Sequence, residues 1–213
     1  MSEYYIPSGP GEAEFTEKRS RFLGHVRMVE SEEEARAFIA EMKRKYYDAR
    51  HNCWCYAIKD GPERYSDDGE PQGSAGIPML EVLRRRELTN AVCVVTRYFG
   101  GVLLGTGGLL RAYTKSTSDA IDAAGISVVR AWRETAIDCS YAQAEKLRTE
   151  IAAAGGLVTD TEYGAAVTLR VLVPEELCGA FHDRIFDVSA GGVDLKYTGE
   201  SFRAVPLSGG VKE

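Results

Sequence analysis

The chain has 213 residues and a formal net charge of −6, with 44% hydrophobic and 27% charged residues. This composition is ordinary for a soluble globular protein, and the length suits one large domain or two small ones. No run approaches the roughly 18 apolar residues of a membrane span, and the first residues lack the basic and apolar pattern of a secretory signal. The sequence therefore predicts a cytoplasmic protein with no membrane contact.

Charge is distributed unevenly along the chain. Residues 1–131 hold 18 Lys and Arg against 19 Asp and Glu, a balance of −1, and residues 132–213 hold 8 against 13, a balance of −5. An acidic chain disfavours broad nucleic-acid binding, although a local basic patch on the first part stays open, and nothing points to DNA in particular. The five cysteines are odd in number and scattered, which predicts reduced thiols.

The first part of the chain alternates strands and helices. Strand-like segments occupy residues 5–28 around the turn signal PSGPGE. Residues 31–49 predict an amphipathic helix with Ser31 as N-cap, Glu34 as its capping-box partner, and an apolar face of Ala35, Phe38, Ile39 and Met42. A half-buried strand at 51–59, a loop at 60–78 and a helix at 77–86 follow. A buried strand at 90–99, a helix at 107–124 and a strand at 125–132 complete this part.

The second part has a regular order of its own. Residues 133–141 predict a strand, 142–155 a helix, 156–164 and 165–174 two strands meeting at Gly164, 175–191 a helix, and 193–205 a strand. The order βαββαβ is typical of a ferredoxin-like domain. The sequence thus predicts two domains, residues 1–132 and 133–213.

The stretch VVTRYFGGVLLGTGGLLRAY, residues 94–113, places five glycines between a β-branched run and a predicted helix. It lacks both the G-x-G-x-x-G dinucleotide pattern and the lysine of a Walker A loop. Gly105, Gly107 and Gly108 lie at a helix start, where free N–H groups attract anions, and Arg97 and Arg111 could flank such a site. Alternatively, the glycines only permit positive φ and close packing.

Asp67, Asp68 and Glu70 place three carboxylates within four positions. A hard cation could use them, but EF-hand spacing is missing, and Asp-Gly and Pro-x-Gly are ordinary turn chemistry. We expect a turn or a partner-binding surface, with no metal and no cofactor.

The segment HNCWCY places His51, Cys53 and Cys55 on the same side of a predicted strand. A Cys/His nucleophile needs contact between the two side chains and a third, orienting group. The simpler interpretation is a half-buried strand in which His51 bonds the neighbouring acidic loop.

Four segments carry a family resemblance: SRF (20–22), DARHNCWCY (48–56), SDDGEPQGSAGIPML (66–80) and residues 94–113. Their order over residues 15–125 resembles the Impact family, and the second part is similar in layout to the ferredoxin-like domain of bacterial, YigZ-type members. Cys55 stands where alanine is more frequent. Leu103 stands where lysine is frequent, which removes a positive charge from the glycine segment.

The resemblance implies an α+β protein: a domain like the second domain of ribosomal protein S5, followed by a ferredoxin-like domain like the fifth domain of elongation factor G. Eukaryotic Impact proteins regulate translation by binding a protein activator of a stress-responsive kinase. For bacterial members, RNA or ribosome association is inferred from the fold, which alone does not establish function.

We therefore predict a non-enzymatic, translation-associated protein whose first domain binds RNA, the ribosome or a translation factor. The alternatives are a regulatory module that binds only protein and, third, a hydrolase that uses His51, Cys53 and the acidic loop. No catalytic residues are assigned. The candidate binding residues are Arg97, Tyr98, Phe99, Gly100, Gly101, Gly105, Gly107, Gly108, Arg111, Asp67, Asp68, Glu70 and His51.

Overall fold

The computed structural model describes residues 3–207 and divides into two compact units. The first unit holds Tyr4–Val129, the second holds Arg130–Arg203, and the chain returns to the first unit at Ala204. The division falls inside one strand, β7 (Ile126–Cys139). The sequence predicted two strands that meet at residues 132 and 133. One strand forms instead, because no glycine or proline interrupts residues 126–139.

An antiparallel sheet of five strands forms the frame of the first unit, in the order β2-β3-β6-β4-β5. Its strands are β2 (Gly11–Glu17), β3 (Ser20–Met28), β6 (Ala91–Tyr98), β4 (His51–Ala57) and β5 (Glu63–Ser66). A short strand, β1 (Tyr4–Pro7), pairs with the first residues of β7. β5 lies in the segment predicted as loop; three of its four side chains are exposed, so no apolar alternation marks it.

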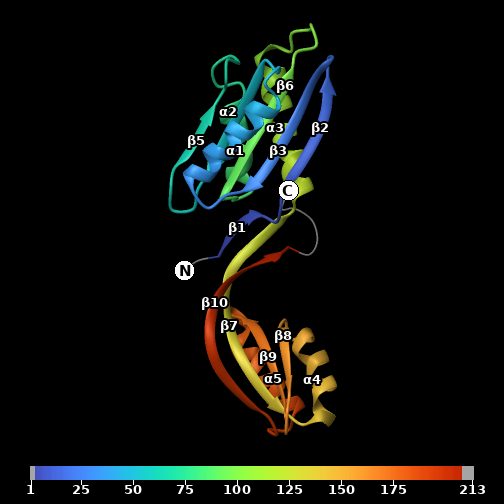
Figure 1. Cartoon of the computed structure of the whole chain (residues 1–213). Coiled ribbons are helices and arrows are strands. Elements are labelled where there is room, and N and C mark those ends of the chain that lie inside the picture. Colours follow the sequence, from blue (N-terminus) through green and yellow to red (C-terminus); the bar gives the residue numbers. More distant parts are fainter. Residues whose placement is uncertain (1–2, 208–213) are drawn as a thin grey trace. The chain divides into compact units, whose positions relative to one another are not determined.

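Three helices cover the two faces of this sheet (Figure 1). α1 (Glu32–Lys45) packs on one face, and α2 (Gly76–Arg85) and α3 (Gly105–Ala124) pack on the other. Successive side chains of β6 point to opposite faces: Val94 contacts the α1 side, whereas Val95 joins the core beneath α2 and α3. Arg97, two positions after Val95, therefore faces α3.

The start of α1 follows the predicted capping chemistry in part. The Ser31 hydroxyl accepts a hydrogen bond from the Glu34 amide at 3.2 Å, as expected for an N-cap. The Glu34 carboxylate, however, accepts from the Glu30 amide at 2.8 Å and not from Ser31. The predicted apolar face of α1 is buried.

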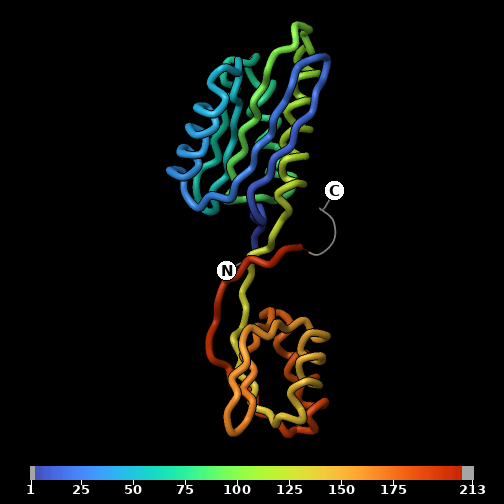
Figure 2. The backbone as a smooth tube through the Cα atoms, turned by 45° about the vertical axis from the view of Figure 1, so that its right-hand side comes forward, coloured from blue at the N-terminus to red at the C-terminus, as the bar shows by residue number. Residues whose placement is uncertain are grey.

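The second unit has the βαββαβ order predicted from the sequence. After the second half of β7 come α4 (Tyr141–Ala153), β8 (Leu157–Tyr163), β9 (Val167–Pro174), a 3₁₀ turn (Glu175–Leu177), α5 (Cys178–Val188) and β10 (Asp194–Pro206). The sheet order β10-β7-β9-β8 places the first and third strands of the motif side by side. Both helices pack on one face of this sheet (Figure 2), around Leu147, Ile151, Leu169 and Phe181. The protein is therefore an α+β protein with an α/β unit followed by a ferredoxin-like unit.

Candidate functional site

Most of the predicted site residues gather at one end of the first unit. Because the strands are antiparallel, the end of β6 meets the starts of β3 and β4: Arg97 lies opposite Phe22 on one side and His51 on the other. The glycine segment that follows β6 and the turn between β2 and β3 reach the same end (Figure 2). A Cβ on Gly100 would lie 2.0 Å from the Arg19 carbonyl carbon. The turn and the segment are thus in direct contact.

Arg97 is buried and is not a surface contact. Arg97 is only 5% exposed. Its Nη1 donates a hydrogen bond to Glu70 Oε1 at 2.7 Å, and its Nη2 donates one to Ser20 Oγ at 3.2 Å. The guanidinium lies 5.5 Å from the ring centroids of both Phe22 and Phe99. Its Nε has no hydrogen-bond partner within residues 3–207. Arg97 therefore joins β6, the acidic loop and the β2–β3 turn from inside.

Glu70 is the centre of this buried network. The same Oε1 that binds Arg97 accepts a hydrogen bond from the Tyr113 hydroxyl of α3 at 2.8 Å, and His51 Nε2 lies 4.0 Å away. Burial, with the nearby Cys53 and Glu70, raises the pKa of Tyr113, which keeps its hydroxyl proton available for this bond. Neither Ser20 nor Tyr113 was among the predicted site residues, although both lie in the family segments.

The other two carboxylates of the acidic loop point elsewhere. Asp67 accepts hydrogen bonds from the amides of Gly73, Ala75 and Gly76 at 2.8–3.0 Å and so caps the start of α2. Asp68 accepts from Lys43 at 2.6 Å and from the Asn52 amide at 2.7 Å. The three carboxylates thus do not converge, and no group of metal-ligating side chains occurs among the described residues.

Cys53 and His51 form no nucleophile pair in the described structure. The Cys53 thiol is fully buried and donates to the Asp67 carbonyl at 3.0 Å, and burial raises its pKa, so the thiolate is disfavoured. His51 Nδ1 lies 2.9 Å from the Asp68 carbonyl, which matches the expectation that this histidine bonds the acidic loop. This geometry therefore gives no support to the hydrolase alternative, because His51 and Cys53 bind separate backbone carbonyls.

The glycines near α3 have different reasons to be glycine. Gly101 and Gly105 have φ values of +81° and +70°, which favour glycine. Gly100 must lack a side chain because it touches Arg19, and Gly108 because its Cβ would lie 2.9 Å from Leu104 Cβ. Gly107 has neither reason: a Cβ there would meet only the Arg111 guanidinium, at 3.6 Å.

A cavity of about 360 Å³ opens beside the start of α3. Arg97, Glu70 and His51 line its polar side, and Phe99 and Leu103 line its apolar side, together with Gly105 and Thr106 of the first helical turn. The side chains of Phe99 and Leu103 are 41% and 82% exposed. The hydroxyl of the neighbouring Tyr98 donates a hydrogen bond to the Asp48 carboxylate at 2.8 Å. The predicted residues Arg97, Glu70 and His51 thus supply a polar wall. Phe99, also predicted, and Leu103, which was not, supply an exposed apolar rim.

Four exposed cations surround this end of the unit: Lys18, Arg19, Arg50 and Arg111. None of them forms an ion pair or side-chain hydrogen bond within residues 3–207. Arg50 lines the cavity just described, while Lys18 and Arg111 line a second hollow of about 260 Å³ on the other side of Leu104. Lys18, Arg19 and Arg50 were not predicted. Lys18-Arg19 between two strand-like segments was the available signal for the turn, and Arg50 lies in the family segment 48–56.

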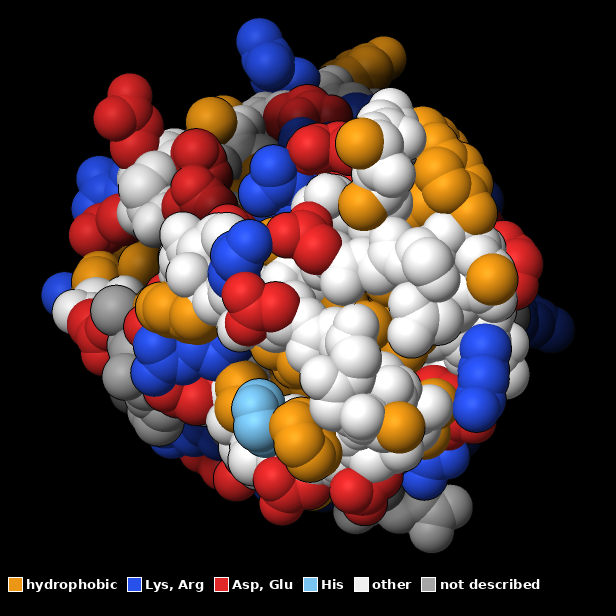
Figure 3. Space-filling model, turned by 90° about the horizontal axis from the view of Figure 1, so that it is seen from below, with side chains coloured by type: hydrophobic (Ala, Val, Ile, Leu, Met, Phe, Trp, Pro, Cys, Tyr) orange, Lys and Arg blue, Asp and Glu red, His pale blue; other side chains and the backbone are white. Residues whose placement is uncertain are grey.

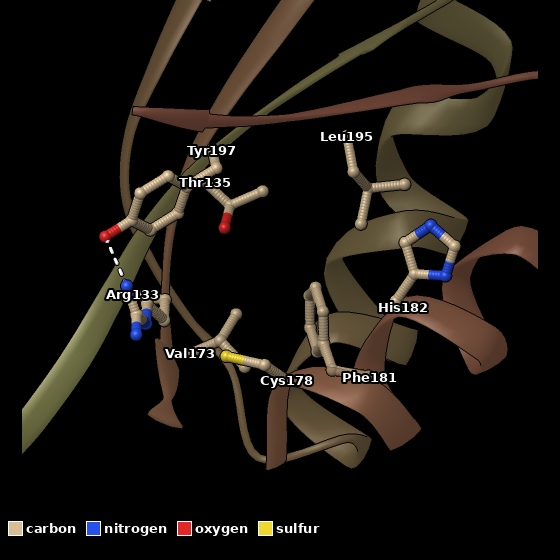
Figure 4. A pocket seen from close by; sticks show the side chains of 8 residues that line it. All are labelled: Arg133, Thr135, Val173, Cys178, Phe181, His182, Leu195 and Tyr197. Carbon is tan, nitrogen blue, oxygen red and sulfur yellow. Dashed lines mark hydrogen bonds between the residues drawn. The ribbon is translucent and has the colours of Figure 1, made fainter. Parts of the chain in front are cut away.

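A further cavity of about 290 Å³ lies in the second unit. Figure 4 shows Phe181, Leu195 and Tyr197 around it, with the Tyr197 hydroxyl accepting from Arg133 at 2.6 Å. Arg133 is also paired with Glu175. Its charge is therefore already neutralised, and the remaining lining is mostly apolar. Among the described helices, none is long and apolar enough to cross a membrane.

Comparison with known proteins places the two units in named families. Residues 18–121 match the model of the Impact N-terminal domain, and residues 137–191 match a domain of unknown function, DUF1949. A solved structure described as the crystal structure of an hypothetical protein has a TM-score of 0.58 and 32% identity, covering 93% of this chain and 98% of that chain.

Similar proteins extend over nearly the whole chain. IMPACT family member YvyE of Bacillus subtilis is 36% identical over 92% of this chain and 91% of its own length. IMPACT family member YigZ of Escherichia coli is 33% identical, over 92% and 98%. Protein IMPACT of Mus musculus is 32% identical over 42% of this chain, which spans 30% of that protein. The chain therefore belongs to the Impact family.

Proposed function

We propose that this protein is a non-enzymatic, translation-associated protein whose first unit binds RNA. One observation carries the proposal: four cations without ion pairs in residues 3–207 surround the start of α3. No acidic residue lies in the first turn of α3, and no side chain caps it. Backbone N–H groups at a helix start and unpaired Arg and Lys side chains both favour phosphate. Membership in a family that includes eukaryotic Impact proteins supports the link to translation.

The second unit lacks comparable free charge. Each arginine of Arg130–Arg203 pairs with a carboxylate, and residues 132–213 carry the balance of −5. Acidic and basic side chains are interspersed over the face that Figure 3 shows. RNA is therefore expected to bind locally, at the α3 end of the first unit.

The exposed rim offers a surface for stacking. Phe99 is 41% exposed beside the cavity, and unpaired RNA bases stack on such rings.

An exposed apolar group of Val102, Leu103 and Leu110 in the same region favours the second candidate function, a protein partner held by apolar contacts.

RNA binding is tested by titrating the full chain with a fluorescent single-stranded RNA over a salt series. Arg50→Ala and Arg111→Ala should each weaken binding and reduce the slope of log affinity against log salt by about 1, because each removes a phosphate contact. The matched control is Arg85→Ala: Arg85 is an exposed arginine in the last turn of α2, away from the α3 start. For Arg85→Ala, the slope of log affinity against log salt should equal that of the wild-type protein.

Absence of binding at low salt would refute the RNA proposal. If Arg50→Ala and Arg85→Ala lose equal RNA affinity, the binding depends on the net charge of the protein and not on a site at the α3 start. Capture of a protein that Leu103→Asp abolishes, with no RNA binding, would establish the protein-binding alternative.

A further inference from the structure

Glu70 brings a free carboxylate oxygen to the cavity of about 360 Å³ that it lines. Its side chain is 3% exposed, and its Oε1 accepts the hydrogen bonds from Arg97 and Tyr113. Its Oε2 accepts none within residues 3–207, yet it is not among the unpaired polar atoms that are sealed from solvent, as the Arg97 Nε is. Because buried acceptors are normally satisfied, an occupant of the cavity that donates a hydrogen bond would complete this carboxylate.

His51 offers a second acceptor in the same lining. Its Nδ1 lies 2.9 Å from the Asp68 carbonyl, and a carbonyl oxygen only accepts, so this nitrogen carries the proton of the neutral ring. Nε2 then has a free lone pair, and it forms no hydrogen bond among the described residues. It lies 4.0 Å from Glu70 Oε1, and the side chain is 11% exposed. Two neighbouring acceptors without donors thus line one cavity.

The charges of the lining disfavour a cationic occupant. Arg97 neutralises the Glu70 carboxylate, and Arg50, which is exposed and has no ion pair within residues 3–207, adds a further positive charge. An ammonium or guanidinium group would therefore meet two arginines against one carboxylate. The donors that suit Glu70 and His51 are neutral, and an anionic group attached to them would find Arg50.

The rest of the lining suits a flat ring. Phe99 is 41% exposed, and Leu103 and Leu104 add apolar surface. Unpaired bases stack on such phenylalanine rings. The volume of about 360 Å³ lies within the roughly 300–1,000 Å³ of small-ligand sites. A single base with its sugar and phosphate therefore matches the cavity in size, shape and charge.

Two neighbouring acceptors select one of the RNA bases. Guanine presents two adjacent neutral donors, its N1–H and its 2-amino group, whereas adenine, cytosine and uracil each place an acceptor beside their donor, which would leave Glu70 or His51 unpaired. We propose that the cavity binds a guanine base of single-stranded RNA, with these donors on Glu70 Oε2 and His51 Nε2 and a neighbouring phosphate at Arg50. This assignment rests on the proposed function and names the base that the RNA presents.

Competition binding of single-stranded RNA to the full chain tests the guanine site. The probes are an oligouridine and the same strand with one central guanosine, inosine or adenosine. The guanosine strand should bind about tenfold more tightly than the oligouridine, as expected when a pair of hydrogen bonds reads one base. The inosine strand lacks only the 2-amino group and should lose most of this gain. The adenosine strand should bind no more tightly than the inosine strand.

Two protein variants check the two acceptors. His51→Phe keeps a ring and removes Nε2, so it should lose most of the guanosine preference and keep the affinity for oligouridine. Glu70→Gln keeps an oxygen for Arg97 and Tyr113 but turns the other acceptor into an amide donor, so it should lose the preference as well. The matched control is His182→Phe, at an exposed histidine of α5 in the second unit. It should retain the full preference.

The outcomes separate the guanine site from the RNA proposal. Equal affinity for the four strands, with the expected salt slope, would overturn the guanine site and leave RNA binding intact. An inosine strand that binds as tightly as the guanosine strand would overturn it too, as would a guanosine preference that survives both His51→Phe and Glu70→Gln. If no strand binds at low salt, the RNA proposal fails and the guanine site falls with it.

Discussion

Arg97 is the residue whose observed position differs most from the predicted one, because it is buried and not a surface contact. A strand residue points to one face or the other according to its position, and the register of β6 directs this guanidinium under α3, onto Glu70. A buried ion pair contributes little net stability, but removing one partner leaves an uncompensated charge in a poorly solvated site. Arg97 and Glu70 thus hold the cavity floor together.

Glu70→Ala is expected to lower the free energy of unfolding by about 3–5 kcal/mol, the usual cost of leaving one buried charge unpaired. Replacing both partners, as in Glu70→Leu with Arg97→Met, should recover most of that loss. Urea unfolding at neutral pH measures both. A double variant no more stable than Glu70→Ala would contradict the role of charge compensation.

His25 is the second residue with a consequence of its own. It is buried, stacks on Tyr46 of the α1 end, and has Glu12 of β2 at 3.4 Å and Lys45 nearby. Burial lowers its pKa below the ordinary value of 6.5. The unfolded chain therefore takes up a proton at a higher pH than the folded chain does. The stability that neutral, buried His25 contributes is therefore complete above about pH 6.5, and it is lost as the pH falls below that value.

His25→Phe should remove this dependence and keep the stacking on Tyr46. Between pH 7.5 and 5.5, the wild-type protein should lose more unfolding free energy than the variant, at up to about 1.4 kcal/mol per pH unit for one proton. Urea unfolding at several pH values measures the difference. Parallel pH profiles for the two proteins would show that His25 does not titrate between the folded and unfolded states.

At the scale of elements, the β2–β3 turn combines strain with charge. Glu17 and Ser20 are paired across a two-residue turn, and its central residues, Lys18 and Arg19, have φ values of +45° and +68°. Asn-Gly suits such a turn far better than two long side chains. Strain at an observed outlier suggests a functional use, here two cations held beside the glycine segment.

Replacing Lys18-Arg19 by Asn-Gly should raise the free energy of unfolding by about 1 kcal/mol, because the left-handed conformation no longer costs energy at those residues. The same variant should bind RNA more weakly and with a lower salt slope, since two phosphate contacts are lost. Thermal unfolding and the salt titration together check this trade-off. Increased stability with unchanged RNA binding would separate the turn from the binding surface.

At the scale of the whole molecule, the two units have separate cores and different surface charge. The first unit packs helices on both faces of its sheet, and the second packs two helices on one face. The second unit neutralises its arginines internally, whereas in the first unit four cations without ion pairs among residues 3–207 lie at the end where α3 begins. A protein with a net charge of −6 therefore retains one local surface suited to an anion.

The sequence by itself determined the elements, the fold class and the family. Periodicity, N-caps and turn residues are local properties, so α1, β6, α3 and the βαββαβ order could be predicted. β5 and the continuity of β7 differed, because the exposed side chains of β5 show no apolar alternation and the change of unit within β7 has no breaker. The helix predicted over residues 31–49 also ends earlier, at Lys45. The motif segments further indicated the Impact family before any contact was known.

Only the tertiary structure decided which of these residues meet. Ser20 and Arg97 are 77 positions apart and share a hydrogen bond, whereas the adjacent Asp67 and Asp68 serve α2 and β4 separately. Strand order and register bring Arg50, the Lys18-Arg19 turn and Arg111 to one end, and alternation buries Arg97. Such contacts depend on the pairing of distant strands, which no local pattern encodes.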